Sequence, residues 1–335
     1  MNPESERTVR ESWTTPAFWR VATVRLVHAA MDCGSDVHAT DDQGLTPLHL
    51  ASAYSQDSSV IRALLADGAH IDARDEAGST PLHRAAISGH ESIVNALLNN
   101  GGDIHARENL GRTALHFASV ESSSKGTITS LLERGADIKA KDDTGSTPLH
   151  YAANSDNQVS AALLLEHGAE IGAKDDSGLS PIHLAVRNGG PAVVEALLEY
   201  GADVNEADGY GVPPLHGAAA HRNPTIVSLL LDQGAEIEAR NDAGETPLHV
   251  AARQAAVLVV QILLSRGADI EAQDDYGNTP LEAAAYGGDR DTMSVLLDRG
   301  AIVGNLYWTE PTLRQLVDEL RPGASPAAPT ASGGT

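Results

Sequence analysis

Fourteen histidines set among 46 acidic residues are the side chains of this 335-residue sequence that could do chemistry. Imidazole and carboxylate groups together can hold a metal ion or transfer protons. Seven of the histidines, however, recur at a fixed interval as the last letter of a Thr-Pro-Leu-His motif: His49, His83, His116, His150, His183, His216 and His249. This regularity indicates a structural role, in which a ring nitrogen returns to the threonine or to a loop backbone group and locks the turn.

The spacing of these seven histidines argues against a shared zinc ion. Packed helices lie roughly 8–10 Å apart, whereas zinc requires each ring nitrogen within about 2.1 Å. The other seven histidines form no His-x-x-x-His pair, and the single cysteine, Cys33, has no histidine at a diagnostic spacing. We therefore expect no metal, no cofactor and no catalytic residue, and interpret Cys33 as a structural thiol.

Composition and charge narrow the possible partners and compartments. The formal net charge of -23 would repel phosphate backbones and acidic lipid headgroups. No apolar run approaches the roughly 18 residues that a membrane-spanning helix needs, and no secretory signal is visible at the N-terminus. We expect no nucleic-acid binding, no membrane insertion and a cytoplasmic protein.

A repeat organises most of the chain. The Thr-Pro-Leu-His motif or a near match begins at eight positions that lie 33 or 34 residues apart: 46, 80, 113, 147, 180, 213, 246 and 279. An acidic residue or asparagine and then a glycine precede each start and predict a tight turn. Threonine and proline are typical of the first positions of a helix, and a second apolar helix that ends at glycine follows. Each repeat is therefore predicted to form two helices that must stack on their neighbours.

Two segments carry the repeat most clearly, DEAGSTPLHRAAISGHESIVNALLNNGGDIHAR and DDSGLSPIHLAVRNGGPAVVEALLEYGADVNEA. They resemble the ankyrin repeat family, and the resemblance extends over residues 41–304. It implies antiparallel helix pairs, β-hairpin loops that project at one edge, and a concave face that holds partners. It also implies that the partner is a protein.

The predicted fold is an all-α repeat solenoid of about nine helical pairs, caps included. Phe18 and Trp19 are expected to cover the first core edge. The predicted segments are a disordered N-terminus at 1–14, a degenerate capping repeat at 15–40, eight repeats at 41–304, a C-terminal capping helix at 305–321 and a disordered tail at 322–335.

Candidate binding residues lie beside the hairpin glycines and at the end of each first helix. Tyrosine and arginine at such positions are residue types that anchor interfaces, and exposed apolar hairpin tips need a reason. The alternative is that they are scattered surface residues. The candidates are Tyr54, Ile87, Leu110, Arg112, Leu179, Arg187, Tyr210, Val212, His221, Arg253, Tyr276 and Tyr286.

These observations favour a non-catalytic, monomeric protein-binding scaffold, adaptor or inhibitor. Because the chain is acidic, we expect a neutral or basic partner protein. The alternatives are a regulatory or targeting subunit of an enzyme complex, an exported effector that binds a host protein, and a structural spacer. One local departure stands out: Pro213 replaces the threonine cap, which should cost its turn about 1 kcal/mol.

Overall fold

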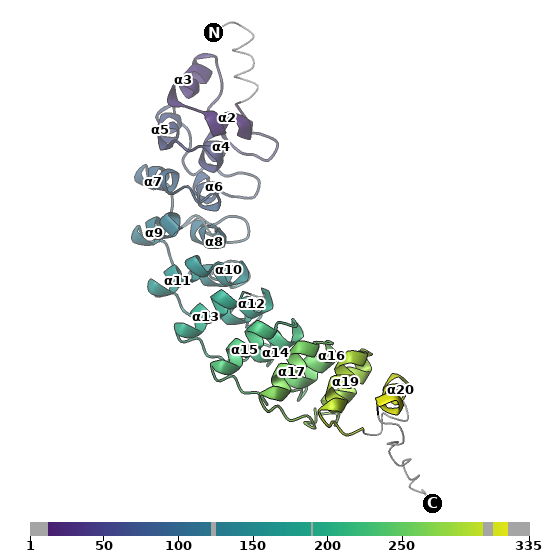
Figure 1. Ribbon diagram of the computed structural model, residues 1–335. Helices are drawn as coiled ribbons and strands as arrows, with labels where there is room; N and C mark the ends of the chain where they lie inside the picture. Colours follow the sequence, from purple (N-terminus) through teal and green to yellow (C-terminus); the bar gives the residue numbers. More distant parts are fainter. Residues whose placement is uncertain (1–12, 122–124, 189, 304–310, 321–335) are drawn as a thin grey trace, which may run out of the picture. The chain divides into compact units, whose positions relative to one another are not determined.

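The computed structural model describes residues 13–121, 125–188, 190–303 and 311–320. These residues form α-helices joined by turns and loops, and no β-strand occurs among them. The chain divides into two compact units, residues 1–176 and 177–335. Consecutive helices pair in both units (Figure 1), which confirms the predicted all-α repeat solenoid.

The first unit is built from two rows of helices. In one row α4, α6, α8 and α10 contact one another in order, and in the other row α5, α7, α9 and α11 do the same (Figure 1). A preceding pair, α2 and α3, packs on α4 and α5. The bounds are α2 Pro16–Val21, α3 Val24–Asp32, α4 Pro47–Tyr54, α5 Ser58–Ala66, α6 Pro81–Ile87, α7 Glu91–Asn99, α8 Ala114–Val120, α9 Lys125–Glu133, α10 Pro148–Asn154 and α11 Gln158–Glu166.

The second unit repeats the same arrangement. Helices α12, α14, α16 and α18 form one row, and α13, α15, α17 and α19 form the other, with α20 against α19. The bounds are α12 Pro181–Asn188, α13 Pro191–Glu199, α14 Pro214–Ala220, α15 Pro224–Asp232, α16 Pro247–Arg253, α17 Val257–Ser265, α18 Pro280–Gly287, α19 Arg290–Asp298 and α20 Pro311–Leu320.

The predicted helix signals lie where the helices begin and end. Thr46 is the extended N-cap of α4, and Pro47 occupies the first helical position, where the missing N–H is harmless. Helix α15 also begins with a cap residue followed by proline. Its cap is Asn223, whose side chain accepts a hydrogen bond from Ile226 N at 3.1 Å. Helix α5 is followed by Gly68, whose φ of 95° lies in the region that favours glycine.

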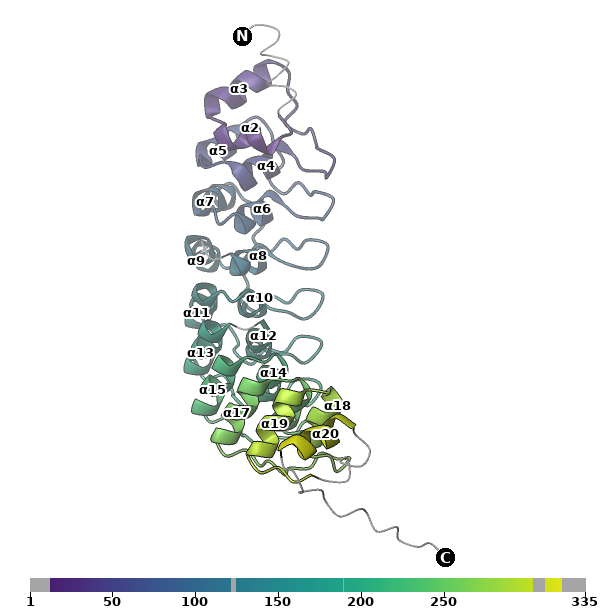
Figure 2. The ribbon, with the colours of Figure 1, turned by 45° about the vertical axis from the view of Figure 1, so that its right-hand side comes forward.

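Hairpin loops project beside the first row of helices (Figure 2). Within one hairpin Asp75 N donates to Ser79 O at 3.1 Å, while Ser79 N donates to Asp75 Oδ1 at 2.9 Å. Neighbouring hairpins are joined because Glu76 N donates to Gln43 O at 3.1 Å. The loops are thus linked along the row by backbone hydrogen bonds, although none of the described residues is a β-strand.

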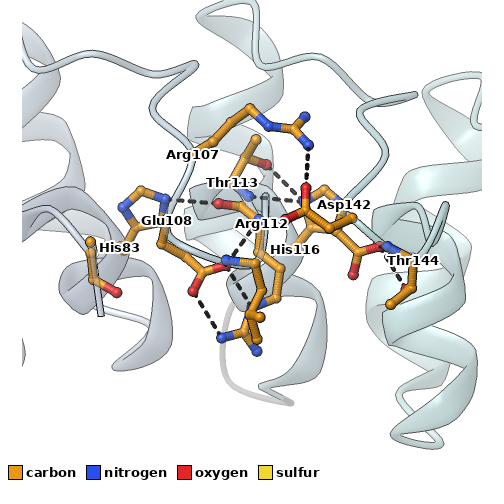
Figure 3. Close-up of polar contacts among 12 residues, drawn as sticks. His83, Arg107, Glu108, Arg112, Thr113, His116, Asp142 and Thr144 are labelled. Carbon is orange, nitrogen blue, oxygen red and sulfur yellow. Dashed lines mark hydrogen bonds and ion pairs between the residues drawn. The ribbon is translucent and has the colours of Figure 1, made fainter. Parts of the chain in front are cut away.

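Four of the motif histidines, His49, His83, His116 and His249, close the turn at the start of their repeat and also bridge to the next repeat. Thr80 N and Thr80 Oγ1 lie 3.0 and 2.9 Å from Nδ1 of His83, and Nε2 lies 3.2 Å from the carbonyl oxygen of Arg112 in the following hairpin (Figure 3). A carbonyl only accepts, so Nε2 carries the proton and Nδ1 accepts. His49, His116 and His249 make the same bridge, to the carbonyl oxygens of Ser79, Ser146 and Asn278. The predicted lock is confirmed at these four histidines, where it joins repeats as well as closing turns.

An aromatic cluster closes the first core edge. Phe18 and Trp19 are buried, as predicted, and Trp13 packs on both, with ring centroids 5.5 and 4.9 Å away. The Trp13 indole N–H donates to Asp36 O at 3.0 Å. The assignment of Trp13 to a disordered N-terminus is therefore wrong, since a large aromatic ring next to an open core edge is buried there.

The ends of the chain were predicted from composition. Residues 1–12, and the tail predicted at 322–335, lie outside the described residues. Within the segment predicted as a capping helix, α20 contacts α19, and Arg290 forms an ion pair with Glu319. None of the described helices is long and apolar enough to cross a membrane.

The buried histidines make stability depend on pH. Burial lowers the pKa of His83 from 6.5 to about 4, and burial also lowers the pKa values of His49 and His116. Below pH 6.5 these histidines become protonated in the unfolded chain, whereas in the folded chain they stay neutral to a lower pH. The free energy of unfolding should therefore fall as pH decreases from about 6.5 to about 4. His83 alone should contribute about 3 kcal/mol of this loss, measurable by urea unfolding across that range.

The matched control is His83→Gln, which removes one titrating group. We expect this variant to be less stable at pH 7.5, yet to have a shallower pH dependence than the original chain. Parallel stability curves for the two proteins would contradict the assignment.

Candidate functional site

A hollow of about 340 Å³ opens on the second unit between α12, α14 and the hairpins that precede them. Five of the twelve predicted binding residues line it: Leu179, Arg187, Tyr210, Val212 and His221. Its other lining residues were not among the predicted ones: His183, Val186, Asp208, Pro213, Pro214, Gly217 and Ala220. The structure thus gathers side chains that had been selected separately from three segments of the chain.

Gly217 accounts for the space inside the hollow. It stands four residues after the capping position, where the other seven repeats carry a side chain: Leu50, Arg84, Phe117, Tyr151, Leu184, Val250 and Ala283. A Cβ atom at Gly217 would lie 3.3 Å from Val186 Cγ1, so a larger side chain would occupy the hollow. The signal was present in the sequence, but it is visible only when this position is compared between repeats.

Pro213 leaves the histidine of the same repeat only half bonded. Pro213 is the N-cap of α14 and supplies neither an N–H nor a hydroxyl group. His216 Nε2 still reaches Glu245 O at 2.9 Å, but its buried Nδ1 has no hydrogen-bond partner in the described part of the chain. Burial lowers the pKa of His216, which keeps the ring neutral and leaves the Nδ1 lone pair unsatisfied.

The rim of the hollow is held by the hairpin and exposed to solvent. Asp208 Oδ1 accepts from Tyr210 N at 2.8 Å and from Val212 N at 2.9 Å. The Tyr210 side chain is 66% exposed. Arg187 and His221, at the ends of the two helices, are also exposed. The backbone of the rim is fixed, and its side chains can be reached by a partner.

The three candidate arginines are in different states. Arg253 is paired with Glu245, with an Nη2 to Oε2 distance of 3.0 Å. Arg112 is paired with the buried Glu108 (Figure 3), and its guanidinium carbon lies 4.5 Å from the Phe117 ring centroid. Arg187 makes no ion pair with any residue that the structure describes. Among these three, Arg187 is the one whose charge an incoming group could pair with.

Two side-chain pairs, Arg112 with Glu108 and Tyr151 with Asp142, stabilise hairpins of the first unit. Burial of Glu108 acts to raise the pKa of its carboxyl, but hydrogen bonds from Arg112 and from backbone N–H groups outweigh burial and lower it. Burial likewise acts to raise the pKa of Asp142, and hydrogen bonds from Tyr151 and Thr144 lower it. Tyr151 Oη donates to Asp142 Oδ2 at 2.7 Å. These side chains are committed to the hairpins and are poorly placed to bind a partner.

The remaining candidates lie apart from the hollow. Tyr54, in the first unit, lies under Arg20 at 5.4 Å from the ring centroid, and lines a second hollow of about 320 Å³ with Asp41 and Asp42. Ile87 is half-buried. Leu110, Tyr276 and Tyr286 are exposed by 57%, 83% and 66%.

A metal site would require histidines and carboxylates to cluster among the described residues. No group of three or more His, Cys, Asp or Glu residues is placed there to hold a metal ion. Cys33 is a free, half-buried thiol at the end of α3. What the described site offers a partner is shape, apolar surface and one unpaired cation.

Comparison with known proteins agrees with the architecture. The family model described as "Ankyrin repeats (3 copies)" matches residues 19–108, 82–175, 115–208, 174–241 and 215–305. A search of curated proteins found no match to this chain.

Truncation should cost stability at Arg112 but hardly at Arg187. Arg112→Ala should lower the free energy of unfolding by about 1–3 kcal/mol, because it leaves the buried Glu108 without its cation. Arg187→Ala should change it by less than about 0.5 kcal/mol, because the side chain is exposed and unpaired. Urea unfolding of both variants measures the difference, and equal losses would contradict it.

Restoring the missing cap should stabilise the second unit. Pro213→Thr supplies an N–H and a hydroxyl to His216 Nδ1, so the free energy of unfolding should rise by about 1 kcal/mol. Pro213→Ala is the matched control, because it restores the N–H alone and should gain less. Thermal unfolding of the two variants tests the order, and a loss of stability in Pro213→Thr would show that the proline fits its turn better than the repeat residue does.

Proposed function

Because the chain belongs to the ankyrin repeat family and such repeats are protein-interaction modules, we propose that it is a non-catalytic scaffold, adaptor or inhibitor. In this proposal the hollow over α12 and α14 is the centre of the binding surface. The partner is a protein, and the chain acts as a monomer in the cytoplasm.

One observation carries the proposal: five of the separately selected side chains line a single hollow. The five are Leu179, Arg187, Tyr210, Val212 and His221, from two neighbouring repeats. The backbone around them is fixed by capping and hairpin hydrogen bonds, so binding would order little of the chain and lose little entropy.

Charge defines the partner further. The chain carries a net charge of -23, and complementary potentials speed encounter and disfavour wrong partners. We therefore propose a protein that is neutral or basic overall. Anchoring residues at interfaces are enriched in tyrosine and arginine, and both types stand on the rim at Tyr210 and Arg187.

A spacer would present a different surface. A spacer needs stacked repeats but no exposed aromatic side chains, whereas Tyr210, Tyr276 and Tyr286 are each at least 66% exposed. These side chains favour binding over the spacer hypothesis.

The test is capture from a lysate of the source cell. The immobilised chain is compared with a variant in which Tyr54, Tyr210, Tyr276 and Tyr286 are all changed to alanine, and retained proteins are identified by mass spectrometry. The matched control is Tyr200→Ala, since Tyr200 is 45% exposed and follows α13, in the other row of helices. We expect proteins that the original chain and the control retain and the quadruple variant loses.

All three proteins must first show the same helical content by circular dichroism. Equal capture by the quadruple variant, or no capture above background by any of them, would refute the proposed surface.

A further inference from the structure

We infer that the hollow over α12 and α14 receives one large apolar side chain, leucine or phenylalanine, from an extended segment of the partner protein, and that a carboxylate beside it in that segment pairs with Arg187. The inference rests on the proposed function and names the chemistry that the same site would select.

Two departures from the repeat coincide at the hollow. Pro213 cannot make the cap hydrogen bonds that threonine makes at the start of helices such as α4. Gly217 lies inside the short helix α14, and glycine has a low helix propensity. Each departure destabilises, yet both residues line the hollow. Sequences tend to break local rules at functional sites, where another requirement outweighs stability. The coincidence therefore indicates that the hollow is a specific feature.

The walls select an apolar occupant. Leu179, Val186, Val212, Pro213 and Ala220 present carbon atoms to the hollow. The one carboxylate of the lining, Asp208, already accepts two backbone N–H groups. Water in such a space finds few partners, so an apolar side chain that displaces it gains free energy. Tyr210, on the rim, adds an aromatic face to cover that side chain.

The hollow is small and open to solvent. At about 340 Å³ the hollow lies at the lower end of the roughly 300–1,000 Å³ typical of small-ligand pockets. Tyr210, Arg187 and His221 are exposed around it, which leaves a main chain free to pass over the opening. An extended segment that inserts one residue satisfies both conditions.

Arg187 determines which residue we expect beside the inserted side chain in the partner segment. Its guanidinium is exposed and makes no ion pair with the described residues, whereas Arg112 and Arg253 are already paired. A planar guanidinium binds a carboxylate through two hydrogen bonds. Because the whole chain is acidic, a strongly acidic segment would be repelled, so we infer a single carboxylate within an otherwise neutral or basic segment.

A displayed library of random twelve-residue peptides tests the inference directly. The immobilised full-length chain should enrich peptides in which leucine or phenylalanine stands within two positions of aspartate or glutamate. Gly217→Leu places the side chain found at Leu50 and Leu184 into the hollow and should weaken binding of the enriched peptides by at least about tenfold, roughly 1.4 kcal/mol. Arg187→Glu should reverse the preference, from acidic to basic neighbours.

Val250→Leu is the matched control, because it enlarges the same register one repeat later, outside the lining of the hollow. It should bind the enriched peptides like the original chain. If Gly217→Leu loses helical content, Gly217→Ala replaces it, since alanine favours the helix and fills part of the space.

Enrichment without an apolar residue, no enrichment above background, or equal binding by Gly217→Leu would each overturn the inference. The lysate experiment distinguishes failure of this inference from failure of the proposed function. Tyrosine-dependent capture without the peptide signature leaves the proposed function standing and rejects this inference, whereas the loss of both results rejects both.

Discussion

Within each unit, the regular part of this structure depends on the histidine that joins one repeat to the next, as at His49, His83, His116 and His249. Its Nδ1 takes the two donors of the capping threonine, and its Nε2–H reaches the carbonyl of the following hairpin, as His83 does with Thr80 and Arg112. One neutral ring thereby fixes the start of a helix and the position of the neighbouring loop. Because a helix pair cannot bury its apolar face alone, this shared bond supports the register in which hairpins and first-row helices present side chains together.

The candidate site arises where this regular arrangement is broken. With Pro213 in place of threonine, His216 keeps the bridge to Glu245 but loses its donors at Nδ1. With Gly217 in place of a larger residue, the surface above α14 is hollow. The bridge to the next repeat survives because it uses the other ring nitrogen, so the repeat can be weakened at its cap without losing its connection to the following hairpin.

Most of the fold was predictable from the sequence, because each repeat must carry its own turn, cap and stop signals. Thr46, Pro47 and Gly68 mark boundaries that the structure places at the same residues. Trp13 was missed because its burial depends on tertiary contacts with Trp19 and Asp36, which no local pattern encodes. The resemblance to ankyrin repeats correctly implied hairpin loops at one edge. It also implied β-hairpins, whereas none of the described residues is in a β-strand.

The site was only partly predictable, for a physical reason. Sequence position identified exposed tyrosines and arginines but could not separate Arg112, held by Glu108 and Phe117, from the unpaired Arg187, because pairing depends on side-chain geometry. The predicted binding residues were all of valine size or larger, whereas Gly217 contributes to the hollow because it has no side chain. In a repeat protein the informative comparison is between registers of the same chain. At the register that holds Phe117 and Tyr151 in other repeats, Gly217 is the one residue without a side chain, and the surface beside it is hollow.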